Sequence, residues 1–436
     1  MKILPSGLSP LQQLILILTS ILITAAGIYS LDLWYLTASS ILKKKNDETP
    51  PPPRRWPNVS IHLPFYNERR VARRILEACA RLDYPKKLLE VIVIDDSNDG
   101  TTAIVESFMR ETNASVKLIH RNSREGFKAG ALQRALEASS GDVIAIFDAD
   151  FIPPRDFLKQ VIPYLYMDDR VAFVQARWTY IDGEFSWYAK AISLAIDIYN
   201  KVDQVARYLA NLIPHFNGTC AVFRKEAIVE VGGWKADTLA EDLDLSIRLK
   251  INGWKHIYLP NLEVPGEIPP TFKALKNQQY RWARGFTECL KKHWKALIAE
   301  KNLTFLQRFE SIIYLATYTL CPISLVGMGV GAAYALMFPK NFYFENLKNY
   351  LLLIFNVILS SVIYTAPLAA ATTTIFKSKN TLKDRARGFV KLIYLSIFFY
   401  TMLLNYSKAV IDGLFKSRGH FHRTPKTGKG QLTIHS

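Results

Sequence analysis

The feature that most constrains the fold is a run of uncharged, almost entirely apolar residues near the start of the chain, from Leu11 to Ile28. A helix of this length can span the hydrocarbon core of a bilayer, which is about 30 Å thick. A cleavable signal peptide is the competing interpretation, but the small residues Thr24 to Gly27 lie inside the apolar run and not after it. We therefore expect a retained membrane span.

Three more apolar stretches follow near the other end of the chain, at residues 312–338, 350–376 and 389–410. Between them and the first run, the composition is that of a globular protein with enough residues for one domain and one core. The expected segments are an N-terminal transmembrane helix (1–40), a basic Pro-rich linker (41–57), a folded domain ending in interface helices (58–306), three transmembrane helices (307–412) and a basic tail (413–436).

The formal net charge of +17 comes largely from lysine and arginine clusters beside the predicted spans, at residues 43–45, 377–391 and beyond 412. Such clusters indicate cytoplasmic orientation and attraction to anionic lipid, not nucleic-acid binding. The four cysteines have no metal-ligand spacing and read as reduced thiols without disulfides. We expect an integral protein of the cell membrane whose folded domain is cytoplasmic and contacts membrane lipid.

The predicted topology contains a conflict at the C-terminus. Three spans after a cytoplasmic domain would place the tail outside, whereas its basic residues, including Lys416, Arg423 and Lys426, favour the inside. Either one C-terminal segment re-enters the membrane or the number of spans differs from four.

The folded domain alternates short β-rich runs with segments of helical period, which is typical of an open parallel α/β sheet. The expected strands are Val59–Leu63, Glu90–Ile94, Val116–His120 and Val143–Phe147, and the clearest helices are Arg69–Arg81 and Lys128–Ala138. In such sheets ligands bind beyond the carboxyl ends of the strands, so residues at those ends are the first candidates for chemistry.

Two of the expected strands run directly into acidic pairs: Asp95 with Asp96, and Asp148 with Asp150. A single aspartate at such a place commonly opens a turn or caps a helix. Carboxylates gathered at strand ends repel one another unless a cation offsets the charge, and hard oxygen ligands suit Mg²⁺ or Mn²⁺. The two pairs together favour a site for a metal-bound diphosphate.

Three other segments carry candidate groups. Lys128, at a glycine-rich helix start, favours phosphate, although a plain turn is the alternative. Asp242, near another helix start, suits a catalytic base, although it could simply cap that helix. Farther on, Arg281 can grip phosphate and Trp282 can stack on a sugar ring, although both also suit an amphipathic helix at the membrane interface.

Together these segments resemble the processive family 2 glycosyltransferases of the GT-A fold, the group that contains cellulose synthases and cellulose-synthase-like mannan synthases. The resemblance extends over about Val59 to Gly285 and is greatest on the mannan-synthase side. It rests on the runs Tyr66-Asn67-Glu68-Arg69, Val93-Ile94-Asp95-Asp96-Ser97, Lys128-Ala129-Gly130-Ala131-Leu132, Ile146-Phe147-Asp148-Ala149-Asp150-Phe151, Val174-Gln175-Ala176-Arg177-Trp178 and Phe216-Asn217-Gly218-Thr219, and on Gln278, Arg281 and Trp282 as Gln-x-x-Arg-Trp.

The resemblance implies an α/β GT-A domain with a Rossmann-like mixed sheet, joined to transmembrane helices, and a role for each motif residue. The residues implied to bind the nucleotide-sugar are Tyr66, Glu68, Asp95, Asp96, Lys128, Asp148 and Arg281. The implied metal ligands, for Mg²⁺ or Mn²⁺, are Asp148 and Asp150. The implied catalytic groups are the base Asp242 with Glu241 and Arg281, in a motif where Ala240 replaces the usual threonine. The residues implied at the acceptor are Phe216, Asn217, Gly218, Gln278 and Trp282.

We therefore expect an inverting enzyme that transfers a hexose from GDP-mannose or UDP-glucose, ahead of a UDP-N-acetylhexosamine, to a growing β-linked polysaccharide. A single-addition transferase with a lipid acceptor, such as a polyprenyl phosphate or a glycolipid, is the first alternative. A catalytically silent membrane scaffold is the second. A nicotinamide enzyme is set aside because GxGxxG is missing after the first strand. With fewer spans than cellulose synthases, the chain is not expected to export a polymer by itself, and a homo-oligomer could supply a larger pore.

Overall fold

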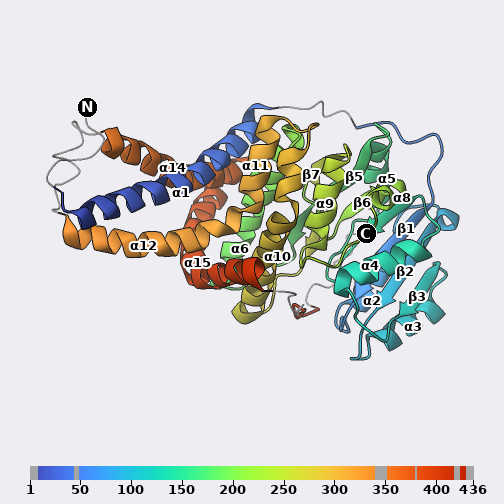
Figure 1. Ribbon diagram of the computed structural model, residues 1–436. Coiled ribbons are helices and arrows are strands. Elements are labelled where there is room, and N and C mark those ends of the chain that lie inside the picture. Colours follow the sequence, from blue (N-terminus) through green and yellow to red (C-terminus); the bar gives the residue numbers. More distant parts are fainter. Residues whose placement is uncertain (1–7, 44–48, 339–350, 379–380, 417–422, 429–436) are drawn as a thin grey trace.

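A computed structural model of the chain places an α/β domain at one end and the long apolar helices at the other (Figure 1). It describes residues 8–43, 49–338, 351–378, 381–416 and 423–428. The sheet and the helices that cover it all lie between residues 58 and 306, as expected from the globular composition of that segment.

In the described part of the chain, seven strands form one mixed sheet with the order β3-β2-β1-β4-β6-β5-β7. Their bounds are β1 Val59–Phe65, β2 Leu89–Asp95, β3 Val116–His120, β4 Val143–Ile146, β5 Val171–Tyr180, β6 Ala221–Arg224 and β7 Lys255–Gly266. The four predicted strands are β1 to β4, and they are parallel as predicted. The sheet as a whole is not parallel, because β6 runs antiparallel to both β4 and β5.

Helices cover both faces of the sheet because successive strand residues point to opposite sides. One face, which includes Ile61 and Val93, packs against α2 (Ala72–Ala80), α3 (Thr101–Glu111) and α5 (Phe157–Leu165). The other face, which includes Ile144 and Ile146, packs against α4 (Phe127–Ala138), α8 (Lys225–Glu230) and α9 (Glu241–Ile251). A short 3₁₀ turn, η1 (Lys86–Leu88), precedes β2.

Further helices connect the sheet to the apolar end of the molecule. The segment from α6 (Trp187–Ile198) through the π-helical turn η2 (Tyr199–Asp203) to α7 (Gln204–Leu209) is continuous. The 28-residue helix α10 (Phe272–Ala299) and α11 (Phe305–Leu315) follow β7. These helices lie between the carboxyl edge of the sheet and the apolar bundle (Figure 1).

Among the described residues, four helices are long and apolar enough to cross a membrane. They are α1 (Pro10–Leu42), α12 (Leu320–Met337), which continues the 3₁₀ turn η3 (Thr317–Thr319), α14 (Leu351–Lys377) and α15 (Leu382–Phe415). The predicted span at residues 312–338 is interrupted, because α11 ends at Leu315 and α12 starts five residues later. The chain is thus a membrane protein by the length and composition of its helices.

Three of these helices, α1, α12 and α14, run side by side. Gln12 of α1 donates to the carbonyl of Met337 at 3.0 Å, and Tyr29 bonds Thr319 at 2.8 Å, so α12 is antiparallel to α1. From Gln12 to Tyr29, α1 rises about 26 Å, close to the thickness of a hydrocarbon core. Lys377 at the end of α14 donates to the carbonyl of Ser40 at 2.8 Å, so α14 ends on the domain side.

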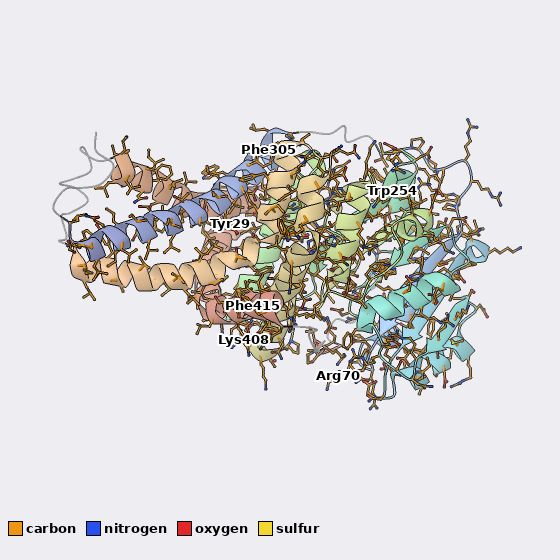
Figure 2. All side chains as sticks on the ribbon, in the orientation of Figure 1. Tyr29, Arg70, Trp254, Phe305, Lys408 and Phe415 are labelled. Atoms are coloured by element: carbon orange, nitrogen blue, oxygen red, sulfur yellow. The ribbon has the colours of Figure 1, made fainter. Side chains whose placement is uncertain are left out.

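The fourth apolar helix, α15, packs against α6 and α10 of the folded domain as well as against α12 and α14. Lys391 near its start pairs with Glu184 at 2.5 Å, and the carbonyl of Leu414 at its end accepts from Lys291 of α10 at 2.8 Å. Figure 2 shows Lys408 and Phe415 beside the domain and not at the far ends of α1 and α12. If α15 lies beside the domain without crossing the bilayer, the number of spans and the basic tail agree.

We therefore predict that the start of α1 is on one side of the membrane and that the folded domain and the end of α15 are on the other. Single cysteines at Gln13, Lys87 and Lys416, in a background where the four buried native cysteines are replaced by alanine, test this with an impermeant maleimide on sealed vesicles. Lys87→Cys and Lys416→Cys should react from the same side and Gln13→Cys from the other. Labelling of Lys416→Cys together with Gln13→Cys would contradict the arrangement.

Candidate functional site

A cavity of about 640 Å³ lies between the carboxyl edge of the sheet and the apolar helices. Its lining includes most residues singled out in the sequence, namely Tyr66, Glu68, Asp96, Lys128, Asp148, Asp150, Asn217, Glu241, Asp242, Gln278, Arg281 and Trp282. The volume is within the range of small-molecule sites. Motifs that are up to 216 residues apart in the chain therefore converge on one space.

Lys128, in the first turn of α4, joins three segments at the centre of this cavity. Its ammonium lies 2.7 Å from Asp148 Oδ1, 2.8 Å from the carbonyl of Gly218 and 3.9 Å from Glu241 Oε1. Burial by itself lowers the pKa of Lys128, but the attraction of Asp148 and Glu241 outweighs it and the pKa is raised. The side chain is therefore a fixed positive charge among carboxylates.

Asp242 and Glu241 occupy the first turn of α9, where the helix dipole stabilises negative charge. Burial, followed by the charge of Glu241, raises the pKa of Asp242 to about 7, although Lys128 and Arg281 oppose this. Asp242 Oδ1 accepts from the backbone N–H of Leu243 at 2.8 Å. A carboxylate with a pKa near neutrality suits a general base.

Arg281 reaches this turn because α10 approaches the start of α9 closely. A Cβ at Gly285 would lie 2.7 Å from the Cβ of Ala240, so glycine permits the contact. Cys289, one turn later, packs against the carbonyl of Ala240 at 3.7 Å. Arg281 lies one turn before Gly285 on the same face, which places its guanidinium near Glu241 and Asp242. The alanine in place of the family's threonine is therefore part of this contact.

Gly218 holds the backbone against the base. Its φ of +77° is in the left-handed region, and a Cβ there would lie 2.8 Å from Asp242 Oδ2 and 3.1 Å from Lys128 Nζ. Gly218 itself does not line the cavity, and Phe216 lies wholly in the core against Phe173 and Phe223. These two residues, predicted at the acceptor, thus shape the loop, and Asn217 is the one that lines the cavity.

The two aspartates at the end of β2 differ in position. Asp96 lines the cavity and takes two bonds from Arg121, at 2.7 and 2.5 Å. Asp95 is fully buried, does not line the cavity, and accepts from Thr102 at 2.6 Å and from the N–H of Ser97 at 3.1 Å. Asp95 therefore orders the turn after β2, while Asp96 faces the cavity.

Tyr66, also at this end of the cavity, lies under the guanidinium of Arg124, 3.3 Å from the ring centroid. A tyrosine ring stacked with an arginine offers a flat wall to a planar group such as a nucleobase.

The C-terminal tail reaches the same acids. Arg423 pairs with Glu68 at 2.8 Å, Lys426 with Asp150 at 2.5 Å, and the N–H of Thr427 donates to Glu267 at 2.8 Å. Burial raises the pKa of Glu68 to about 7 despite Arg423. From the sequence, these tail cations were predicted to lie at the membrane surface, because the local sequence shows their charge and not their partners.

Asp148 and Asp150 are suitable for a divalent cation that also binds a ligand's phosphates. They offer hard oxygen atoms, and Mg²⁺ commonly takes only one or two carboxylates besides substrate phosphates. No group of three His, Cys, Asp or Glu side chains that could hold a metal occurs among the residues that the structure describes. Lys426 pairs with Asp150, so this contact would have to open for a cation to bind there.

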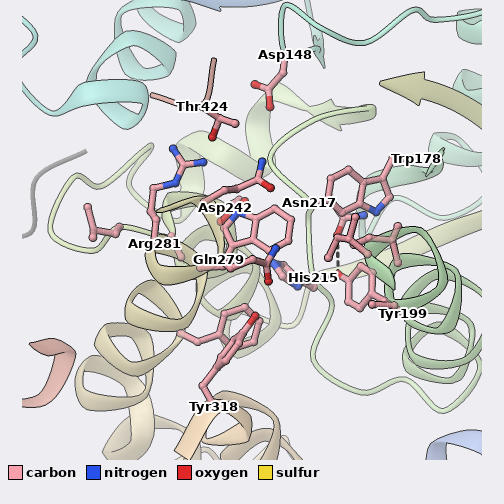
Figure 3. Close-up of a pocket in the computed structure, with 18 of the residues that line it drawn as sticks. Asp148, Trp178, Tyr199, His215, Asn217, Asp242, Gln279, Arg281, Tyr318 and Thr424 are labelled. Carbon is pink, nitrogen blue, oxygen red and sulfur yellow. Dashed lines mark hydrogen bonds between the residues drawn. The ribbon is translucent and has the colours of Figure 1, made fainter. Parts of the chain in front are cut away.

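The far part of the cavity is aromatic. The rings of Trp178 and Trp282 are 5.9 Å apart, and Tyr318 lies farther toward the apolar helices (Figure 3). Trp178 was noted in a motif without an assigned role, and Gln279, Tyr199 and His215 were not singled out although they line the same space. Burial in a cavity formed by distant segments has no signature in the local sequence.

Comparison with known proteins identifies the domain. Residues 60–232 match the family model described as Glycosyl transferase family 2, and residues 216–376 match the one described as Cellulose synthase. Probable glucomannan 4-beta-mannosyltransferase 7 of Oryza sativa subsp. japonica is 38% identical over 261 residues, which are 58% of this chain and 45% of the rice protein. Glucomannan 4-beta-mannosyltransferase 2 of Arabidopsis thaliana is 29% identical over 385 residues, 86% of this chain and 68% of the plant protein.

The chain thus spans about half the length of most of the curated relatives cited, including 50% of glucomannan 4-beta-mannosyltransferase 9 of Arabidopsis thaliana. Among solved structures, the mannosyltransferase PcManGT from Pyrobaculum calidifontis, in complex with GDP-Man and Mn²⁺, has a TM-score of 0.62 and 22% identity over 92% of this chain and 99% of its own. The predicted GT-A fold and the predicted relationship to cellulose-synthase-like proteins are confirmed.

We predict that Gly218→Ala destabilises the protein more than Gly100→Ala, which also has a positive φ (+89°) but no atom within 4 Å of the added Cβ. Both changes carry the left-handed penalty of about 1–2 kcal/mol, and only the first crowds Asp242, for about 1–3 kcal/mol more. The unfolding midpoint in detergent, followed by fluorescence on heating, should be several degrees lower for Gly218→Ala. Equal midpoints would contradict the close contact.

Proposed function

Because this chain carries a family 2 glycosyltransferase domain and is related to the cellulose-synthase-like mannan synthases, we propose that it is a membrane-bound hexosyltransferase that works by inverting, single displacement. It would extend a β-linked polysaccharide. The observation that carries the proposal is the meeting of Asp242, Arg281 and Lys128 in one cavity with the strand-end acids. That set contains a base, two cations for a leaving diphosphate and ligands for its metal.

The reaction follows from these positions. The carboxylate of Asp242 takes the proton from an acceptor hydroxyl, and that oxygen attacks the anomeric carbon from the side opposite the leaving group. The bond from the anomeric carbon to the diphosphate breaks, and its electrons remain on the phosphate oxygen. Arg281 and Lys128 lie where this negative charge develops, which is where fixed cations accelerate a reaction most. One displacement inverts the configuration at carbon 1.

A divalent cation is part of the proposal. Asp148 and Asp150 would hold Mg²⁺ or Mn²⁺, and the ion would supply charge neutralisation for the diphosphate. The Mn²⁺ bound by the structural relative PcManGT supports this choice. Lys426 would be displaced from Asp150 when the ion binds, so the tail is expected to move between the empty and loaded states.

For the donor, we propose GDP-mannose first and UDP-glucose second, ahead of a UDP-N-acetylhexosamine. The curated relatives are named as glucomannan mannosyltransferases, and the solved relative contains GDP-Man. Tyr66, Glu68 and Asp96 would receive the nucleoside, as expected from the sequence. The enzyme is proposed to lie in the cell membrane with this domain in the cytoplasm, and any homo-oligomer would form through its apolar helices.

A lipid acceptor is the second candidate, and one observation favours it. Tyr29 and Leu33 of α1 and Pro367 of α14 line the same cavity as Asp242, so the space reaches the helices that would contact lipid. A polyprenyl phosphate or glycolipid could bring its head group to the site along that route. The alternative of a catalytically silent scaffold would leave the converging catalytic groups without a role. The absence of donor hydrolysis and of transfer under every condition would favour that alternative.

Product analysis tests the proposal. Detergent-purified protein is incubated with Mn²⁺ or Mg²⁺ and each radiolabelled nucleotide-sugar, with EDTA as the control, and polymer is separated from organic-phase product. Metal-dependent incorporation into a β-glycosidase-sensitive polymer would support a polysaccharide synthase. Label confined to the organic phase would establish the lipid-acceptor alternative in its place, and no transfer from any donor would overturn both.

Asp242→Asn should lower kcat by about 10²- to 10⁴-fold because it removes the base, while the donor dissociation constant changes little. For the native enzyme, kcat/KM should fall about tenfold per pH unit below about pH 7, because the base works only when deprotonated and its pKa is about 7. Steady-state rates between pH 5 and 9 and calorimetric donor titrations provide both values.

The matched control is Asp237→Asn, which removes an exposed carboxylate that pairs with Lys292 near the same loop. It should retain the native rate within about twofold. Near-native turnover in Asp242→Asn, or a profile that is flat from pH 5 to 7, would show that Asp242 is not the base.

A further inference from the structure

Three nitrogen donors around the far part of the cavity lack partners. Trp178 Nε1, Asn217 Nδ2 and Gln279 Nε2 have no hydrogen-bond acceptor among the residues that the structure describes, and all three side chains line the cavity. A buried donor that stays unsatisfied costs about 1–3 kcal/mol. Since each atom can only donate, a ligand that satisfies them must present acceptor atoms.

The orientation of the Asn217 amide is fixed by its neighbours. Its Oδ1 accepts from Tyr199 Oη at 2.6 Å and from Gln204 Nε2 at 2.9 Å. Gln204 Nε2 also donates to the carbonyl of His215 at 2.8 Å, so this end of Gln204 is the nitrogen. Asn217 must therefore present its oxygen to Gln204, and its own NH₂ remains for a ligand.

Gln279 is held by a residue from α15. It is only 3% exposed, and its Oε1 accepts from Tyr406 Oη at 2.8 Å. On α10 it lies three residues before Trp282, so the two side chains share one face of the helix. Tyr406 thus occupies the oxygen of Gln279, and the NH₂ of Gln279 has no partner in the part of the chain that the structure describes.

Gln279 lies beyond the base, and Asn217 lies beside it (Figure 3). In Figure 3, Asp148 is at one end of the site and Tyr318 at the other, with Asp242, Asn217 and Gln279 between them. The donor sugar's diphosphate belongs at the Asp148 end. A ligand that satisfies Gln279 therefore lies on the acceptor side, past the hydroxyl that Asp242 would deprotonate.

The chemistry of the walls favours neutral oxygen atoms over a phosphate. Asp32 and Asp203 line the deeper part of this space, and the guanidinium of Arg207 beside them is already bonded to Asp203 and Glu310, at 2.7 Å each. Arg207 is therefore already occupied and does not offer its guanidinium to a phosphate. A sugar ring offers hydroxyl oxygen atoms to the donors and an apolar face to the indole of Trp178.

We propose that Gln279, Asn217 and Trp178 form a second acceptor subsite, which binds the sugar ring next to the one being extended, and that Tyr406 is the positioning residue for Gln279. This inference rests on the proposed function, because it assumes that Asp242 activates the acceptor hydroxyl. It implies that an acceptor with two β-linked hexoses is used better than one with a single ring.

The test compares methyl β-mannoside with β-1,4-mannobiose, and the matching glucosides, using whichever nucleotide-sugar the native enzyme hydrolyses. The native enzyme should prefer the disaccharide about tenfold in kcat/KM. Gln279→Leu keeps the size and removes the donor, so it should lose most of that preference while the monosaccharide value stays within about twofold. Tyr406→Phe should lower the disaccharide preference about threefold, because the amide of Gln279 is no longer held.

Controls remove the same groups elsewhere. Gln160→Leu changes an exposed glutamine on α5, and Tyr400→Phe changes an exposed tyrosine on α15. Both should keep the native preference. Donor affinity, measured by calorimetry with Mn²⁺, should be native in all four variants, which also shows that they are folded.

Four outcomes would overturn the subsite. An unchanged disaccharide preference in Gln279→Leu, or an equal loss for both acceptors, would show that Gln279 is only structural. Transfer by the native enzyme without any disaccharide preference would remove the subsite and leave the proposed function standing. Absence of both donor hydrolysis and transfer in the native enzyme would overturn the proposed function and the subsite together.

Discussion

The site depends on one buried ammonium. Lys128 bonds Asp148 after β4 and the carbonyl of Gly218, and it lies 3.9 Å from Glu241 at the start of α9. These contacts fasten together three segments that are separated by 20 to 113 residues in the chain. Without the cation, the carboxylates of β4 and α9 would repel one another across the cavity. The ammonium of Lys128, which holds the site together, is therefore also a positive charge that would lie near a departing diphosphate.

The second constraint is the approach of α10 to α9. Gly285 has no side chain, and a Cβ there would lie 2.7 Å from the Cβ of Ala240, so glycine permits the close approach that sets Arg281 beside Asp242. The same helix presents Gln279 to α15 on another face. Thus α10 links the reaction centre to the helices at the membrane.

The sequence was sufficient for elements defined by local pattern. Strands β1 to β4 are buried hydrophobic runs, and two of them end in acids, so their parallel order and the ligand edge could be predicted. Strands β5, β6 and β7, and the antiparallel direction of β6, were not predicted. The position of α15 beside α10 could not be predicted, because its hydropathy is high enough for a membrane span. Only its partners, such as Lys291, show where it lies. Arg423 likewise meets Glu68 across 355 residues, a pairing that charge alone does not specify.

The central claim, a single displacement with Asp242 as base, is tested most directly by the configuration of the first glycosidic bond. Proton NMR of the earliest product from an α-linked nucleotide-sugar distinguishes the two anomers before any later rearrangement. The account predicts that a β-glycoside appears as the donor disappears. An α-glycoside as the first product would require a double displacement or a front-side reaction, and would contradict the assignment of Asp242.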